Sequence, residues 1–366
     1  MNLVVAGDFS PMNRVSEIIK KGDFGKLMVG GGNFEKDVFV LNFETTLKKE
    51  SCKKISKVGP HLCTTDESIG CLNALGVKAV TLANNHTFDY GKEGLSLTID
   101  KLVENGIQYV GAGRNQTEAQ KTLYLKQGNE TVAIINCCEH EFSYAEDNKA
   151  GTNALNPINQ YYAIQDACKS ADYVVIIVHG GHEFFNLPSV RMQETYRFFI
   201  DAGADAVINH HQHCFSGYEK YKGKPIYYGI GNFCFDWPGK KSTFYTGYCV
   251  RLNLAKEITT EEIPYTQCKE EPNIIFHEFE GFRKELNRLN AIIKDSKTLQ
   301  EEVSRFYISK ENDCKGVLSP ISNSKLNALM RRGILPSLIS ENKKLMWKAY
   351  VDCESHRDTM LHYLKQ

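Results

Sequence analysis

Residues 174–183 read Val-Val-Ile-Ile-Val-His-Gly-Gly-His-Glu, a run of five apolar residues that leads into a histidine and two glycines. Apolar runs of this length, bounded by glycine, asparagine or aspartate, are typical of strands that are buried on both faces. We therefore predict a central strand over residues 174–178, with His179 at its carboxyl end.

Similar short apolar runs recur through the first three-quarters of the chain. They cover residues 3–6, 38–41, 79–83, 132–135 and 206–208. Stretches with helical spacing lie between several of these runs, at residues 67–75, 95–104 and 193–202. Strands that alternate with helices in this way predict an α/β fold.

The predicted strands are followed by side chains that can bind a metal or transfer a proton. These are Asp8; Asn42 and Glu44; Asn85, His86 and Asp89; His179 and Glu183; and His210, His211 and His213. In α/β sheets, ligands bind outside the carboxyl ends of the strands. We therefore expect these side chains to face one crevice.

A crevice with this composition favours a bound cation. Carboxylates and imidazoles that converge on a buried site repel one another, and each unpaired buried charge costs several kcal/mol. The mixed nitrogen and oxygen donors fit one or two divalent ions, with Mn, Fe or Zn favoured and Mg as a further candidate. His211 and His213 are two residues apart, so a strand end or turn can direct both rings to one side.

Taken alone, each residue also has a purely structural interpretation. Asp8 could cap the next helix, Glu44 could stabilise a turn, and His179 could be a hydrogen-bonded core histidine. Asn85 and His86 could form a hydrogen-bonded pair in a loop. The metal hypothesis therefore depends on the whole group, because these residues all follow predicted strands.

The composition excludes some classes of function. The 44 Lys and Arg residues balance the 44 Asp and Glu residues, which speaks against a chain that coats nucleic acid or anionic lipid. The amino terminus lacks a signal-peptide pattern, and no apolar stretch reaches the roughly 18 residues of a membrane span. We therefore expect no membrane anchor in this chain. The cysteines lack CxxC spacing, so we expect mostly free thiols and a cytoplasmic location.

The chain changes character near residue 274. The residues beyond it hold only 3 of the 28 glycines and 2 of the 10 prolines. Their apolar positions recur at helical steps, at Phe279, Phe282, Leu286, Leu289 and Ile293, then Leu326 and Leu329, then Leu345, Tyr350, Leu361 and Leu364, with breaks at Pro320 and Pro336. We predict a core over residues 1–274 and a helical C-terminal extension over residues 275–366. The extension could be a packing cap, gate the substrate or bind a partner.

The motifs at the strand ends resemble those of the CapA family, the capsule or poly-γ-glutamate synthesis proteins of the calcineurin-like metallophosphoesterase superfamily. The resemblance covers roughly residues 2–255. Its densest stretches are residues 82–91 (Leu-Ala-Asn-Asn-His-Thr-Phe-Asp-Tyr-Gly), residues 110–113 (Val-Gly-Ala-Gly) and residues 179–236. The resemblance implies a four-layer α/β/β/α metallophosphoesterase-like sandwich with the helical extension appended.

The resemblance also implies roles for single residues. It implies a metal-ligand set of Asp8, Asn42, Glu44, Asn85, His179, His211 and His213, in which His210 would replace His211 if the loop were shifted by one residue. It makes His86 the general acid or the phosphate contact. We predict Asp89 and Glu183 as further catalytic residues.

Three positions depart from the family pattern. Asn209 stands where glycine is usual, Gln212 where proline is usual, and Gly180 where tryptophan is frequent. These differences bear on the shape of the pocket and leave the predicted ligands intact.

The predicted function is metal-dependent hydrolysis or transfer at a phosphoester or a similar anionic substrate, either a small molecule or a polymer. One alternative is hydrolysis of the amide bonds of poly-γ-glutamate, which requires a long cleft. Another is a non-catalytic place in a capsule-synthesis assembly, with a protein partner bound through the helical extension.

Overall fold

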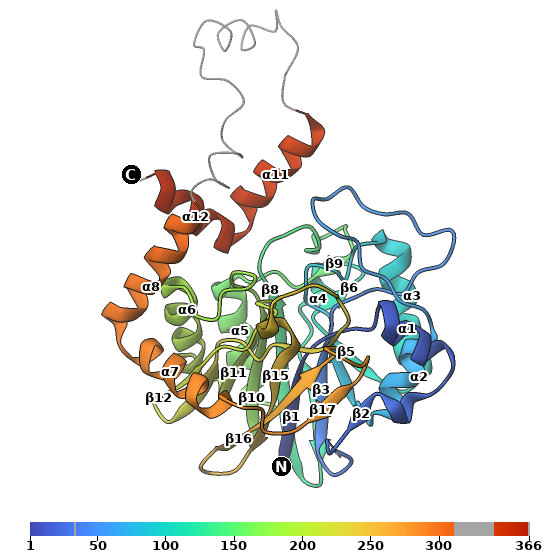
Figure 1. Ribbon diagram of the computed structural model, residues 1–366, viewed down its shortest axis with the longest axis horizontal. Coiled ribbons are helices and arrows are strands. Elements are labelled where there is room, and N and C mark those ends of the chain that lie inside the picture. Colours follow the sequence, from blue (N-terminus) through green and yellow to red (C-terminus); the bar gives the residue numbers. More distant parts are fainter. Residues whose placement is uncertain (33, 311–339, 365–366) are drawn as a thin grey trace, which may run out of the picture.

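Two β-sheets pack face to face, and helices cover their outer faces (Figure 1). The structure is a computed structural model that describes residues 1–32, 34–310 and 340–364. Its architecture is the α/β/β/α sandwich that the resemblance implied, so the predicted fold class is confirmed.

The first sheet contains the amino-terminal strand at its centre. Its order is β2 (Met28–Val29), β17 (Ile274–Phe276), β16 (Thr259–Gln267), β15 (Thr246–Asn253), β1 (Asn2–Ser10), β3 (Val38–Phe43), β4 (Ala79–Thr81) and β5 (Gln108–Val110), and β14 (Asn232–Phe235) also pairs with β1. Strands β1, β3, β4, β5 and β14 run parallel, whereas β15 and β16 pair antiparallel.

The second sheet contains the strand that the 174–178 run predicts. Its order is β12 (Tyr218–Tyr221), β13 (Lys224–Tyr227), β11 (Ala206–His210), β10 (Tyr173–His179), β8 (Glu130–Cys138) and β7 (Leu123–Gln127). Strands β8, β10, β11 and β13 are parallel. The short strands β6 (Ala112–Gly113) and β9 (Gly151–Thr152) form a separate pair.

Alternation along β1 explains how one strand serves two cores. Leu3 and Val5 share a hydrophobic core with strands of the second sheet. Val4 and Ala6 point to the opposite face and share a second core with helices of the outer layer. Each fully buried Leu or Val side chain of this kind stabilises the fold by about 1.5–3 kcal/mol.

Helices form the two outer layers (Figure 1). The outer face of the first sheet is covered by α1 (Asn13–Lys20), α2 (Glu67–Ala74) and α3 (Gly91–Glu104), with η1 (Phe24–Lys26) beside them. The second sheet is covered by α5 (Pro157–Ala167) and α6 (Val190–Asp201). The short helix α4 (Gln116–Ala119) packs on β6 and β9, and η2 (Ser242–Tyr245) precedes β15.

The C-terminal extension is helical, as predicted. It comprises α7 (Phe282–Lys294), α8 (Ser296–Ser309), α11 (Glu341–Asp352) and α12 (Glu354–Leu364). The predicted apolar positions of α7 are buried. In α12, by contrast, Leu361 and Leu364 are exposed, and the buried side chains are Glu354, Ser355 and Thr359. Helix α12 therefore packs through polar groups. The positions expected at Leu326, Leu329, Pro320 and Pro336 lie outside the described residues.

Two further expectations concern compartment and domain organisation. Within the described ranges, no helix has both the length and the apolar character that a membrane crossing needs. Every cysteine in those ranges is a free thiol, as predicted. The cytoplasmic location and the domain boundary at residue 274 stay predictions.

A bulge in β1 places the first candidate ligand. The pairing of β1 with β3 shifts register between Ala6 and Asp8, which leaves Gly7 out of the ladder. A Cβ at Gly7 would lie 1.8 Å from the carbonyl oxygen of Gly231, so a side chain has no room there. The bulge therefore re-aims Asp8 at the carboxyl end of the sheet.

Gly7→Ala should lower the free energy of unfolding by about 1–3 kcal/mol, because the backbone of residue 231 must move to admit the methyl group. Urea unfolding monitored by circular dichroism measures this loss. Gly25→Ala is the matched control, since its added Cβ meets nothing within 4 Å, and we expect a change within about 0.5 kcal/mol. Equal losses in the two variants would contradict the close approach.

Candidate metal centre

The predicted ligands come together between the carboxyl ends of the two sheets. Asp8 and Asn42 lie in β1 and β3 of the first sheet, and Glu44 directly follows β3. His179 ends β10 of the second sheet. Asp8, Asn42, Glu44 and His179 are all at most 2% exposed. The crevice therefore draws on both sheets, each of which delivers polar side chains into a dry interior.

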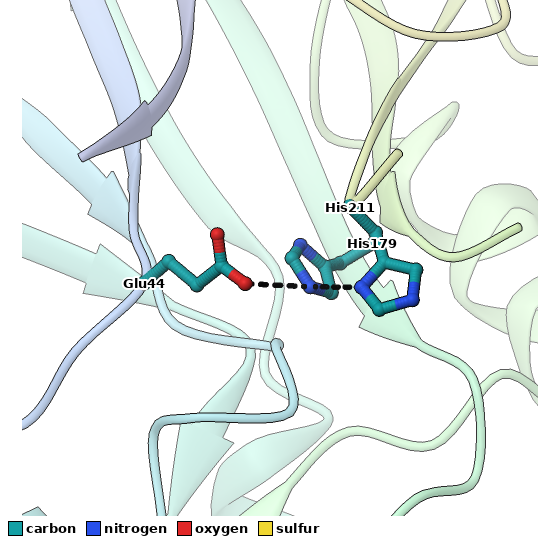
Figure 2. A group of neighbouring side chains, drawn as sticks. All are labelled: Glu44, His179 and His211. Atoms are coloured by element: carbon teal, nitrogen blue, oxygen red, sulfur yellow. Dashed lines mark hydrogen bonds and ion pairs between the residues drawn. The ribbon is translucent and has the colours of Figure 1, made fainter. Parts of the chain in front are cut away.

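The first group surrounds the Nε2 atom of His179. Figure 2 shows the Glu44 carboxylate and the rings of His179 and His211 directed toward one another. From His179 Nε2, the distances are 3.0 Å to His211 Nδ1, 3.1 Å to Asn85 Oδ1 and 3.5 Å to Glu44 Oε1. Two ring nitrogens, an amide oxygen and a carboxylate oxygen thus face a common point.

The second group shares Glu44 with the first. His213 Nδ1 lies 3.6 Å from Asp8 Oδ2, and His213 Nε2 lies 3.9 Å from Glu44 Oε1. Within each group, the ligand-type atoms of the carboxylates and histidines lie within 4.8 Å of one another. Because Glu44 belongs to both groups, its carboxylate would be a ligand in either of them.

The state of Glu44 tests whether a cation fits. Both of its carboxylate oxygens are buried and find no hydrogen-bond partner among the described residues. Burial raises the pKa of Glu44 well above its usual value, and the neighbouring Asp8 carboxylate raises it further. Burial likewise lowers the pKa of His179 well below its usual value, and the charges of the other histidines add to that effect. A cation would satisfy the orphaned carboxylate and prefers neutral imidazole, so the donor set fits a divalent metal.

Strained backbone fixes the histidines of the 211–213 turn. His211 and His213 adopt φ angles of 89° and 53°, in the left-handed region that non-glycine residues rarely occupy. Phe184, in the facing loop, has a φ of 62°, and its backbone N–H donates to the carbonyl of Gln212 at 2.8 Å. Such conformations cost about 1–3 kcal/mol each and concentrate at functional sites. The turn directs both rings to one side, as expected, with ring centroids 6.1 Å apart.

The structure distinguishes between the two adjacent histidines. His211 belongs to the first group, whereas His210 is buried in β11 and belongs to neither group. The geometry thus selects His211 as the candidate ligand.

The asparagines occupy two different positions. Asn85 presents its Oδ1 to His179, as a ligand would. The Asn42 Oδ1 accepts hydrogen bonds from Thr81 and Asn84, while its Nδ2 donates to Asp8 Oδ1 at 2.7 Å. This arrangement orients the Asp8 carboxylate, and the role of Asn42 as a ligand stays a prediction.

His86 and Asp89 form a buried pair beside the ligands. His86 Nδ1 lies 2.7 Å from Asp89 Oδ2, and Lys57 forms a buried ion pair with Asp89. Burial lowers the pKa of His86, although the hydrogen bond with Asp89 opposes that shift. Asp89 does not border the cavity and contacts His86 Nδ1 instead, and its catalytic role stays a prediction. His86 itself lines the cavity and is the candidate for contact with substrate.

A cavity of about 390 Å³ opens onto this centre. Among the predicted residues, Asn85, His86, Glu183 and His213 line it, with Glu183 at an exposed position. Its volume lies in the range of small-molecule sites, about 300–1,000 Å³.

Three residues of the site were not among the predicted ones. Asn232 Oδ1 accepts a hydrogen bond from His213 Nδ1 at 2.8 Å, which turns Nε2 toward Glu44. Glu141 lies 3.6 Å from His211 Nε2, and Lys57 lines the cavity beside His86. Asn232 follows an apolar run, as the predicted ligands do, so the same sequence signal could have identified it. Lys57 and Glu141 lie in loops, where no such signal exists.

Comparisons with known proteins identify relatives of this chain. The capsule biosynthesis protein CapA of Bacillus anthracis is 30% identical over 265 residues, which cover 69% of this chain and 64% of that protein. The PGA biosynthesis protein CapA of Bacillus subtilis (strain 168) is 31% identical over 222 residues, covering 59% of this chain and 58% of the relative. The chain thus spans about 60% of the length of these curated relatives.

A solved structure described as a novel phosphatase of Mycoplasma pneumoniae overlaps with a TM-score of 0.44 at 15% identity, covering 73% of this chain and 93% of that one. An overlap of this extent says nothing about activity. The family model described as bacterial capsule synthesis protein PGA_cap matches residues 2–237, well over half of the chain. The resemblance to CapA proteins is therefore confirmed, and the chain belongs to the PGA_cap family of bacterial capsule synthesis proteins.

Proposed function

We propose that the chain is a metal-dependent hydrolase that cleaves a phosphoester or a similar anionic substrate. The observation that carries the proposal is the buried Glu44 carboxylate, which finds no hydrogen-bond donor among the described residues and is shared by two groups of ligand-type side chains. A purely structural role would leave this carboxylate uncompensated at a cost of several kcal/mol.

The proposed ligands are Glu44, Asn85, His179 and His211 for one cation, and Asp8, Glu44 and His213 for a second. Bound there, a divalent cation supplies Lewis-acid chemistry, since it activates water and neutralises charge on phosphoryl oxygens. The candidates are Mn, Fe, Zn and Mg, in keeping with the mixed nitrogen and oxygen donors.

Residues of the chain itself would orient the substrate and supply the proton. His86 donates or shares its Nδ1 proton with Asp89, and its Nε2 makes no hydrogen bond with any described residue. In the imidazolium form, which the hydrogen bond with Asp89 favours, that nitrogen also carries a proton and can donate it to a phosphoryl oxygen or to the leaving oxygen. The Lys57–Asp89 ion pair would hold the Asp89 carboxylate, and through it the imidazole, in place.

The names of the relatives favour a second candidate. Because both are described by capsule or PGA biosynthesis, the substrate could be poly-γ-glutamate, with an amide bond as the scissile group. The same residues would serve that reaction. A non-catalytic place in a capsule-synthesis assembly, with a partner bound through the helical extension, is the remaining proposal.

A substrate panel decides between these functions. Purified full-length protein is stripped with EDTA, reloaded with Mn, Fe, Zn or Mg, and assayed on phosphomonoesters, phosphodiesters and poly-γ-glutamate. We expect phosphoester hydrolysis that is lost with EDTA and restored by metal. Release of glutamate oligomers alone would support the amide hydrolase, and no hydrolysis with any metal would contradict both enzymatic functions.

A further inference from the structure

Helices α11 and α12 of the C-terminal extension supply part of the wall of the metal-centre cavity. Met346, Ala349 and Tyr350 of α11 and His356 of α12 line it, together with side chains of the core. Both helices lie at the end of the molecule where α8 ends (Figure 1). The extension is therefore adjacent to the site, although its sequence carries no ligand motif.

Tyr350 and His356 separate this cavity from a second one. Their rings stack with centroids 5.1 Å apart and an interplanar angle of 25°. Both residues also line a cavity of about 300 Å³ that is bordered by His182, Phe306 and Thr359. The pair borders both spaces, as Glu183 and Phe184 also do, so the stacked rings form part of the partition between them.

His356 brings a polar atom to this partition. Its Nδ1 is buried and makes no hydrogen bond with the described residues. A buried polar atom without a partner costs about 1–3 kcal/mol. A rotation of the ring that brought this nitrogen to a polar group of a molecule in the cavity would recover that cost.

A buried polar clamp holds α12 in this position. Glu139, which follows β8, lies 2.6 Å from Arg191 Nη2 and accepts a hydrogen bond from Ser355 Oγ at 2.5 Å. Arg191 Nε also donates to Asp358 Oδ2 at 2.8 Å. Burial opposes ionisation of Glu139, but the charge of Arg191 and the Ser355 hydroxyl lower its pKa to about 2.

A second contact lies next to the clamp, where His140 Nδ1 is 2.6 Å from Glu354 Oε1. Glu139 also accepts a hydrogen bond from the Gly181 backbone N–H at 3.3 Å, in the loop directly after His179. The clamp thus ties the partition to the strand end that bears a candidate ligand. Networks of fully satisfied buried groups specify one arrangement, so the position of the wall is fixed.

We propose that the Tyr350–His356 pair is a specificity-determining wall, which limits the cavity to a small anionic molecule or the end of a chain. On rotation of its ring, His356 would bind a polar group of that substrate through Nδ1. The inference rests on the proposed function of the metal centre and adds the size class of its substrate.

The test compares a small and a bulky ester in the full-length, Mn-loaded protein. The esters are p-nitrophenyl phosphate and bis(p-nitrophenyl) phosphate. Tyr350→Ala removes one ring of the partition, and we expect it to raise the kcat/KM for the bulky ester relative to the small one by about 10-fold. Val351→Ala is the control, since Val351 lies on the same helix and is 65% exposed, and it should leave the ratio unchanged. An unchanged ratio in folded Tyr350→Ala protein overturns the proposal.

If neither ester is hydrolysed, the proposed hydrolase function is contradicted, but the role of the wall is not. A binding measurement then tests the wall. The chain has two tryptophans, and Trp237 lines the cavity. In a Trp347→Phe background, quenching of Trp237 by bis(p-nitrophenyl) phosphate reports occupancy. Adding Tyr350→Ala should then lower the Kd about 10-fold. An equal Kd, or no quenching in either protein, overturns the wall.

Discussion

Glu44→Gln is expected to lower turnover by about 10³-fold, because the shared carboxylate serves both candidate cation sites. Metal-based stabilisation of the transition state is worth several kcal/mol, and each 1.36 kcal/mol is a factor of ten in rate. The substitution keeps the size of the side chain and removes its charge. Steady-state kinetics on the best phosphoester, with metal content measured on the same samples, provides the test.

In the metal-free protein, the same substitution should raise the free energy of unfolding, although it lowers turnover when metal is bound. Without a cation, the Glu44 carboxylate is buried beside Asp8 and has no donor in the described part of the chain, so a neutral amide should stabilise the metal-free protein by about 1 kcal/mol. Chemical unfolding in EDTA measures this gain.

Glu262→Gln is the matched control for a buried carboxylate. Glu262 is 9% exposed, accepts a hydrogen bond from Tyr227 Oη at 2.6 Å and pairs with Arg283. Its neutralisation should destabilise the protein with or without metal and leave turnover unchanged. If Glu44→Gln also destabilised the metal-free protein and retained full activity, Glu44 would be an ordinary structural residue.

His86→Gln should lower kcat by about 10²–10⁴-fold, the usual contribution of a positioned acid or base. His86 lines the cavity, and neither candidate metal group includes it, so its loss should leave metal content unchanged. Kinetics and metal analysis on the same preparation separate this effect from loss of a ligand.

His61→Gln provides the comparison for His86. Its ring Nε2 lies 2.8 Å from the Ile55 carbonyl oxygen, and it does not line the cavity. We expect activity within about twofold of the unmodified protein, as for a substitution away from the site. Loss of metal from His86→Gln, or equal activity in the two variants, would exclude an acid or phosphate-binding role for His86.

The strand ends could be predicted from sequence because strand burial and ligand position obey short-range rules. The run over residues 174–178 forms β10, and His179 stands at its last position. The same rule led from β1 to Asp8 and from β3 to Glu44. Local sequence patterns could not show that the two sheets pack together. This packing places Glu44 Oε1 3.5 Å from His179 Nε2.

The site residues that could not be predicted from sequence are those placed by polar contacts between distant parts of the chain. Lys57 lies in a loop and forms an ion pair with Asp89. Glu141 lies in a different loop, with its carboxylate close to the His211 ring. The place of α12 was unpredictable for a related reason. Helical periodicity points to apolar faces, whereas this helix packs through Glu354 and Ser355 on partners more than 200 residues away. No spacing rule connects such pairs, because their geometry is set by the completed fold.

The most direct test of the central claim is the metal stoichiometry of EDTA-stripped, full-length protein titrated with Mn²⁺ and analysed by mass spectrometry after dialysis. A centre bridged by Glu44 predicts saturation at about two ions per chain in the unmodified protein. It predicts a lower stoichiometry in His211→Ala, which removes a ligand of only one group, and loss of both ions in Glu44→Gln. An unmodified protein that retained no more metal than Glu44→Gln would contradict the account.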